Sequence, residues 1–194
     1  MIKEAIKGAL EVIKEIQQIL PVKRLIQKDL KQKTASTACY YYRNIMVISY
    51  MTEKDIDPNE VYDMLLKKKC INEASAKVLN NDTFAKALGL NKTYKNSKPN
   101  PDKMIELLKQ NIPLLGSFDV IHKNGDVTNH AMVISGYTKY DDELLFLITD
   151  PDKYKSDTHL DPKTWKSFRQ ESDKRVIVSG AGSTRKLSSF GWFA

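Results

Sequence analysis

The chain has 194 residues, of which 41% are hydrophobic and 28% are charged, as in an ordinary globular protein. Its net charge is +7, but the lysines alternate with acids, and Lys67-Lys68-Lys69 is the one compact basic run. Because no basic residues interleave with aromatic ones, we expect no nucleic-acid partner. No apolar run approaches the roughly 18 residues that span a bilayer, so we expect a soluble chain without a membrane span. The N-terminus also lacks a signal-peptide core.

Residues 2–20 carry apolar side chains spaced alternately four and three positions apart. This spacing predicts an amphipathic helix that Pro21 ends. The apolar positions are Ile2, Ile6, Ala9, Ile13, Ile16 and Leu20. We expect residues 1–21 to be a helix appended to a single domain over residues 1–194. It would either pack on the body or act as a partner-docking or inhibitory element.

A series of helices follows in the first half of the chain. The predicted helices are a run within 34–50 that has Cys39 in its first turn, 57–68 with Asp57 as its cap, 73–80, 83–88 with Asp82 as its cap and Gly89 at its end, and 100–110. The polar stretch 91–100 predicts a loop. Helical periodicity therefore dominates up to residue 110.

Strands dominate the second half of the chain. They are predicted at 112–122, 127–137, 144–149 and 175–179, with a hairpin turn at Asn124-Gly125. The polar composition of residues 156–172 predicts a connecting segment with a turn of helix around Trp165. Helices first and antiparallel strands second indicate an α+β fold, with an N-terminal helical half packed on a C-terminal antiparallel sheet.

Cys39 is the candidate nucleophile, because it stands in the first turn of a buried helical run. The preceding hydroxyl residues Thr34, Ser36 and Thr37 are suited to cap that helix. The helix dipole and a nearby imidazolium would lower the thiol pKa from about 8.5 to about 3.5–7.5. Cys70 belongs to no Cys-x-x-Cys pair, so we expect a small buried hydrophobe rather than a zinc ligand.

His130 and a carboxylate would complete the site. If strands 127–137 and 144–149 pair about the turn at 139–142, His130 lies opposite Asp150, and a carboxylate there would fix the imidazole. Pairing about Asn124-Gly125 would instead place Asp119 opposite His130. The sequence geometry leaves both acids open.

The order of these motifs resembles the C39-like branch of the papain-like cysteine peptidases over about residues 32–152. The similar segments are Ile112-Pro113-Leu114-Leu115-Gly116, His130-Ala131-Met132-Val133-Ile134-Ser135-Gly136-Tyr137 and Asp150-Pro151. The resemblance implies a papain-like fold in which the thiol helix lies against a sheet that carries the imidazole. It also implies Cys39 as nucleophile, His130 as base and Asp150 as the orienting acid. Gln32 would be the oxyanion-hole donor, with Thr34 as a weaker substitute.

The predicted function is therefore a cysteine peptidase that cleaves a peptide or amide bond, with no cofactor and no metal. Two alternatives remain: an inactive peptide-binding relative, since Tyr40-Tyr41 replaces the Gly-Pro that the family places after its Cys, and a transamidase. His122 and His159 are expected at the surface.

Overall fold

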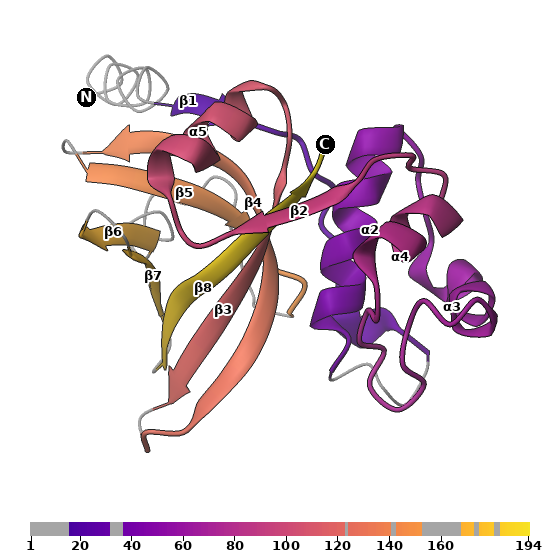
Figure 1. Ribbon diagram of the computed structural model, residues 1–194. Helices are drawn as coiled ribbons and strands as arrows, with labels where there is room; N and C mark the ends of the chain where they lie inside the picture. The colour runs from indigo at the N-terminus through magenta and orange to yellow at the C-terminus, as the bar shows by residue number, and fades with distance from the viewer. Residues whose placement is uncertain are drawn as a thin grey trace, which may run out of the picture.

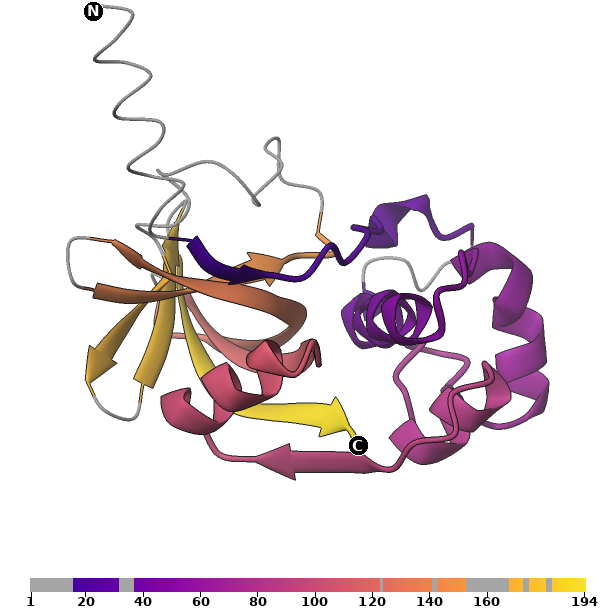
Figure 2. The ribbon, with the colours of Figure 1, turned by 90° about the horizontal axis from the view of Figure 1, so that it is seen from above.

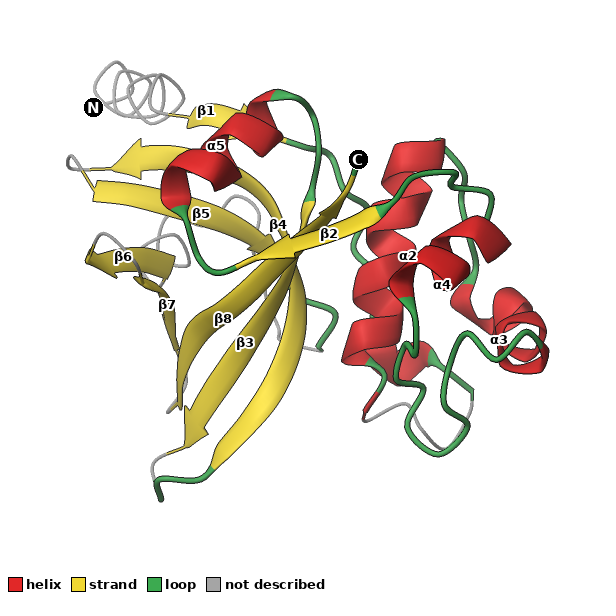
Figure 3. Cartoon of the chain, viewed as in Figure 1, coloured by secondary structure: helices red, strands yellow, loops and turns green. Residues whose placement is uncertain are grey.

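The computed structural model describes residues 16–31, 37–122, 124–140, 143–152, 168–172, 175–180 and 183–194. The helices are η1 (Gln27–Asp29), α2 (Cys39–Thr52), α3 (Pro58–Lys67), α4 (Asn81–Ala87) and α5 (Pro101–Lys109). The strands are β1 (Ile16–Ile19), β2 (Tyr94–Ser97), β3 (Leu114–His122), β4 (Val127–Tyr140), β5 (Glu143–Thr149), β6 (Phe168–Ser172), β7 (Arg175–Gly180) and β8 (Ser183–Phe193). Helices α2, α3 and α4 gather on one side, and the sheet with α5 forms the other (Figure 1, Figure 3). Among the described residues, no helix is long and apolar enough to cross a membrane.

Two of the predicted helices begin as expected, each with a capping side chain followed by proline. Asp57 accepts a hydrogen bond from the Asn59 amide (2.7 Å) at the start of α3, and Asn100 accepts one from the Lys103 amide (3.1 Å) at the start of α5. The capping oxygens satisfy amides that have no partner within the helix. The predictions of these two helices are thus confirmed.

Helix α2 begins without a capping side chain. Its N-cap is Ala38, and the preceding hydroxyl of Thr37 donates to the Ser75 carbonyl instead (3.1 Å). The predicted hydroxyl cap is therefore wrong, because the candidate hydroxyl is used in a contact with a distant loop. Cys39 is nevertheless the first residue of the helix, as predicted.

Helix α2 is the buried core of the helical half. Tyr41 packs edge-on against Tyr62 and Phe84, with ring centroids 5.7 and 5.9 Å apart, and its hydroxyl donates to the Pro58 carbonyl (2.6 Å). Residues 45–48 of α2 are also buried. Burial on nearly all sides fixes the direction of the helix, and with it the position of Cys39.

The strands form an eight-stranded antiparallel sheet in the order β1-β4-β3-β8-β7-β6-β5, with β2 paired to β8. Because β5 also pairs with β4, the sheet closes on itself. The long strand β4 pairs with β3 over residues 127–134 and with β5 over residues 133–140. Beyond Ile134, the partner of the first residue of β3, residues 136–138 of β4 pair with β1 instead (Figure 2). The combination of helices with an antiparallel sheet confirms the predicted α+β fold class.

Strand β8 pairs with three other strands of the sheet, and no sequence pattern predicted it. It pairs with β3 and β7, and its last residues pair with β2, where Lys95 lies opposite Trp192. The predicted loop at 91–100 is therefore wrong at β2. A four-residue polar strand has no pattern of its own, because it forms only where a distant partner supplies the hydrogen bonds.

Further predictions need correction. Residues 16–19 form β1 rather than the end of a helix, because the backbone here pairs with β4 and the Leu20 amide bonds to the Ser135 carbonyl (2.7 Å). Residues 1–15 lie outside the described residues, so the appended helix and its docking role stay predictions. Residues 168–172 form β6 inside the predicted polar connection. Trp165 lies outside the described residues.

No helix forms at residues 73–80. The side chain of Asn72 accepts hydrogen bonds from the Ala74 amide and the Ser75 hydroxyl, and Ile71 forms a bridge with Val78. Side-chain bonds of this kind compete with helix formation.

The predicted helix at 83–88 forms as α4, two residues earlier than expected. Its cap is Asn80, which accepts from the Thr83 amide (2.9 Å), because Asp82 instead accepts from the Tyr94 amide. The chain leaves the helix through Gly89, whose positive φ of 88° suits glycine, as predicted.

Candidate active site

The site lies where the start of α2 meets β4. Cys39 and His130 are 8% and 9% exposed, so both side chains are close to the surface without being open to bulk water. The two side chains are near enough for each to shift the pKa of the other, and the Ala131 backbone also acts on the Cys39 thiol. Folding therefore brings together a thiol and an imidazole that are far apart in sequence.

The surroundings favour a charged pair of thiolate and imidazolium. Burial raises the pKa of the Cys39 thiol, but the hydrogen bond and charge of His130, the Ala131 amide and the Arg43 charge together hold that pKa below its ordinary value. Burial lowers the pKa of His130, but its hydrogen bonds to Asp150 and Cys39 raise that pKa to about 9. A lowered thiol pKa is the property that makes a cysteine nucleophilic at neutral pH.

Asp150 holds the other side of the imidazole. Nε2 of His130 donates to Oδ1 of Asp150 at 2.6 Å, and Asp150 is 1% exposed. The Asp152 amide donates to the same Oδ1 (2.9 Å), and Nη1 of Arg185 donates to Oδ2 (2.7 Å). Burial raises the pKa of Asp150, but these partners outweigh burial and keep the carboxyl pKa below its ordinary value. Asp150 is therefore a carboxylate, and it leaves Nδ1 of His130 for the thiol.

The hairpin register that placed Asp150 opposite His130 is wrong. Thr149 pairs with Val133, so continuing the ladder would place Asp150 opposite Met132. The shift includes a bulge at Ser135, whose hydroxyl accepts from the Thr149 hydroxyl (3.2 Å). Since alternate residues share a face of a strand, Asp150 still lies on the face of His130 and reaches it diagonally.

The rival register for Asp119 is also wrong. Phe118 pairs with His130, and Asp119 pairs with Asn129, whose side-chain amide donates to it (2.9 Å). The hairpin closes with the His122 amide bonded to the Asp126 carbonyl, so the turn is one residue longer than the predicted two-residue turn. Because the extra residue shifts the pairing of the two strands by one position, Asp119 lies on the face of the sheet opposite to that of His130.

Arg43 is a site residue that sequence reasoning missed. It lies one helical turn after Cys39, is 2% exposed, and donates through Nη1 to the Gly116 carbonyl (3.2 Å) and the Ser117 hydroxyl (3.1 Å). Its guanidinium also lies 4.7 Å from the centre of the Tyr40 ring. No described carboxylate bonds to it. Arginine is ordinarily a surface residue, so its spacing of four from Cys39 was the one available signal.

A segment remote in sequence, residues 24–27, holds the loop that carries Asp150. Arg24 donates through Nε to the Asp150 carbonyl (2.8 Å) and through Nη2 to the Asp152 carbonyl (2.6 Å). The Gln27 amide donates to the Pro151 carbonyl (2.8 Å). The backbone around the carboxylate is thus fixed independently of its side chain.

The remaining candidates are Gln32, Thr34, His122, His159 and Cys70. Gln32, Thr34 and His159 fall outside the described residues. His122 is exposed and its Nε2 lies 2.9 Å from the Thr128 hydroxyl, and Cys70 is buried. Within the described ranges, no three His, Cys, Asp or Glu side chains are grouped closely enough to hold a metal ion.

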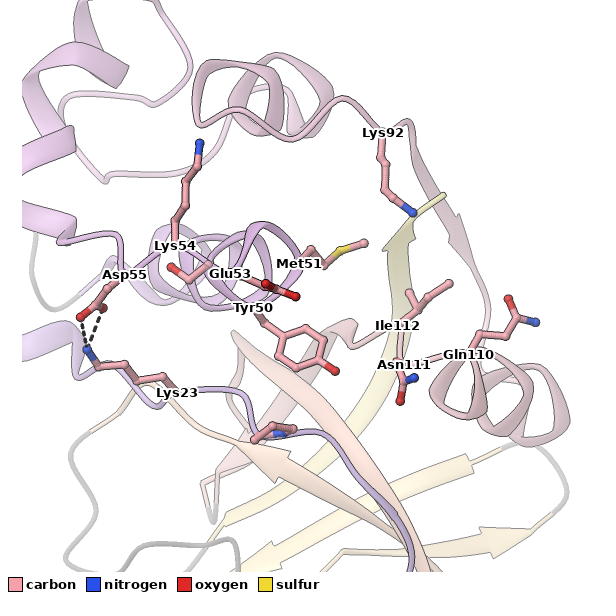
Figure 4. Close-up of a pocket in the computed structure, with 12 residues that line it drawn as sticks. Lys23, Tyr50, Met51, Glu53, Lys54, Asp55, Lys92, Gln110, Asn111 and Ile112 are labelled. Carbon is pink, nitrogen blue, oxygen red and sulfur yellow. Dashed lines mark hydrogen bonds and ion pairs between the residues drawn. The ribbon is translucent and has the colours of Figure 1, made fainter.

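A cavity of about 770 Å³ lies at the opposite end of α2, where Tyr50 and Met51 contribute to its wall. Figure 4 shows the ion pair of Lys23 and Asp55 (2.7 Å) at its side. Helix α2 rises about 1.5 Å per residue, so Tyr50 is roughly 16 Å along the helix axis from Cys39. This cavity is therefore separate from the site of Cys39 and His130.

The family described as "Papain-like cysteine protease AvrRpt2" matches residues 22–173, which is more than half of the chain. No curated protein matches the chain. The matched region contains Cys39, His130 and Asp150, together with Arg24 and Arg43. The chain belongs to this family of papain-like cysteine proteases.

Proposed function

We propose that the protein is a cysteine peptidase that cleaves a peptide or amide bond through Cys39, His130 and Asp150. The proposal is carried by two observations: Cys39 and His130 each shift the pKa of the other, and His130 forms a hydrogen bond of 2.6 Å with Asp150. A nucleophile, a base that it touches and an acid that orients the base are the three parts of a nucleophilic triad. The family match supports the same activity class.

In the proposed reaction, the Cys39 thiolate attacks the scissile carbonyl carbon and forms a tetrahedral intermediate. The His130 imidazolium then gives its proton to the departing amine, which leaves an acyl-enzyme. Neutral His130 next takes a proton from water, whose oxygen attacks the thioester carbonyl and releases the acid and the thiol. Asp150 fixes the ring throughout.

The oxyanion needs hydrogen-bond donors. We propose the Cys39 backbone amide at the start of α2 and, as the sequence resemblance implies, the side chain of Gln32. An amide at a helix N-terminus has no intrahelical acceptor and is available for this role. The resemblance to the C39-like branch remains a prediction beside the broader family membership.

The pKa of Cys39 favours catalysis over the inactive peptide-binding alternative. A binding module needs a cleft but gains nothing from a thiol whose pKa lies below the ordinary value in spite of burial. A transamidase would use the same acyl-enzyme, with an amine in place of water as the acceptor.

The test combines labelling of the thiol with product analysis. Purified protein is incubated with a peptide library, and the products are read by mass spectrometry with and without an added primary amine. We expect new peptide termini in both samples; products that carry the added amine in preference to water would indicate the transamidase.

The same protein is labelled with iodoacetamide across pH. Cys39 should react rapidly at neutral pH, and its alkylation should abolish cleavage. The control variant Cys70→Ala should be labelled at Cys39 and should cleave peptides as the unchanged protein does. A Cys39 that reacts no faster than an ordinary thiol, in a protein that cleaves nothing, would reject the peptidase in favour of the binding module.

A further inference from the structure

The carboxylate of Asp150 has two oxygens with different partners. Oδ1 accepts from His130 and from the Asp152 amide, whereas Oδ2 accepts from Nη1 of Arg185 at 2.7 Å. The side chains of Asp150 and Arg185 are 2% and 13% exposed. An ion pair this far from water is screened little, so its geometry and charge matter more than those of a surface pair.

Arg185 comes from the interior of the sheet rather than from a loop. Its backbone in β8 pairs with Val120 of β3 on one side and with Val178 of β7 on the other. Nη1 also lies 3.6 Å from the Met132 sulfur, on the β4 residue that the ladder would place opposite Asp150. The guanidinium is thus held toward the carboxylate by two flanking strands.

The proposed reaction gives this pair a specific task. His130 alternates between imidazolium and neutral imidazole, so during part of the cycle it provides no positive charge beside Asp150. A buried carboxylate without a counter-charge raises its own pKa and takes up a proton. A guanidinium stays charged throughout, and it can therefore keep Asp150 ionised when His130 is neutral.

We propose that Arg185 is a positioning residue that orients the Asp150 carboxylate toward His130 and serves as its permanent counter-charge. The inference rests on the proposed function for the role of His130 in turnover. The bond of Arg185 to this group of residues is to Oδ2 of Asp150, and Arg185 would act on the ring through that carboxylate.

The experiment compares Arg185→Met, which removes the charge and keeps the length, with Arg185→Lys, which keeps the charge. We expect Arg185→Met to lower kcat about tenfold while KM changes less than about twofold, and Arg185→Lys to recover most of the loss. The His130 ring is followed by NMR across pH in the same proteins. Without the guanidinium the imidazolium is the remaining counter-charge of Asp150, so the His130 midpoint should rise in Arg185→Met.

Lys186→Met is the matched control, because it removes the same charge from the next residue of β8, whose backbone pairs with Asp119. It should leave both kcat and the His130 midpoint unchanged. Equal effects of Arg185→Met and Arg185→Lys on kcat, or equal shifts of the midpoint in Arg185→Met and Lys186→Met, would overturn the inference. If Arg185→Met does not fold, Arg185→Gln answers the same question.

The two proposals fail separately in this design. A protein that cleaves no peptide but shows a His130 midpoint that depends on Arg185 would reject the peptidase and keep the Arg185–Asp150–His130 coupling. A protein that cleaves peptides at the same rate with and without the Arg185 charge would keep the peptidase and reject the role of Arg185.

Discussion

The surroundings of Cys39 and Cys70 differ although both thiols are free and buried. Cys70 follows the end of α3, and its sulfur donates to the Lys68 carbonyl (3.7 Å). Burial raises the pKa of the Cys70 thiol, and the charge of Lys68 only partly opposes that rise. Burial acts on Cys39 in the same direction, yet His130 reverses the outcome.

The comparison shows that burial near a basic residue is not enough to activate a thiol. Lys68 contributes charge alone, whereas His130 contributes charge and a hydrogen bond to the sulfur, and its ring is fixed by Asp150. A buried cysteine is otherwise an inert small hydrophobe. Each prediction below removes one part of this difference.

Removing the thiols themselves should have the largest effect. Cys39→Ala should lower peptide cleavage by about 10⁴-fold or more, because no other group can form the acyl-enzyme. Cys70→Ala should lose stability, since it leaves a small cavity in the core, but should keep kcat within about twofold. Turnover and thermal unfolding measured on both proteins check this, and comparable losses of turnover would erase the distinction between the two cysteines.

Asp150→Asn should lower kcat by about 10²- to 10⁴-fold, because an amide can hold the ring in the wrong tautomer and cannot stabilise the imidazolium. Asp119→Asn is the control, since Asp119 bonds to Asn129 instead of the ring. Steady-state kinetics on the two variants decide between the acids. A larger loss in Asp119→Asn would contradict the role of Asp150.

His130→Gln should make Cys39 resemble Cys70. The pKa of Cys39 should then rise above its ordinary value, because burial is the largest influence and its main opponent is gone. We expect alkylation by iodoacetamide at neutral pH to slow by roughly 10- to 100-fold. An unchanged alkylation rate would show that His130 does not activate the sulfur.

The pH dependence should follow the two partners. Cleavage should rise as pH passes the lowered pKa of Cys39 and fall as pH passes the His130 pKa of about 9, where the imidazolium is lost. His130 also affects the stability of the fold. Its pKa in the folded protein lies above the ordinary 6.5, so the contribution of His130 to the free energy of unfolding is complete below pH 6.5 and is lost as pH rises through about 9. Rate profiles and unfolding midpoints across pH check both statements.

Arg43→Met should have the smallest effect on the thiol, because the Arg43 charge is the last of the influences that lower the pKa of Cys39. We expect alkylation to slow by about two- to threefold, and Arg43→Lys to slow it less. Thermal unfolding of the two variants separates this effect from loss of the contacts to Gly116 and Ser117.

The sequence predicted those parts of the molecule whose signals are local. Asp57 and Asn100 cap their helices through amides two or three residues away, and Gly89 leaves α4 with positive φ, so each can be read from a short window. The placement of Cys39 at the start of a helix could likewise be predicted from a short stretch of sequence. Chemistry of this kind needs no knowledge of the rest of the fold.

Features set by distant partners were missed. Strand β2 pairs with β8, and β1 pairs with residues 136–138 of β4, beyond Ile134, the partner of the first residue of β3. The His130–Asp150 contact was expected for an incorrect reason. The turn lies further along the chain than predicted, since Tyr140 pairs with Glu143, and the bulge at Ser135 then shifts the register by one residue. Arg185 could not be connected to the site while β8 itself was unknown.

The hydrogen bonds from Arg24 to the backbone of Asp150 and Asp152 join positions 126 and 128 residues apart. Contacts with such large sequence separations carry a high loop-closure cost and form late in folding. During synthesis, the emerging polypeptide therefore holds Cys39 long before a base or an acid is available to it. The thiol therefore lacks the two partners that lower its pKa until His130 and Asp150 have been made and folded beside it.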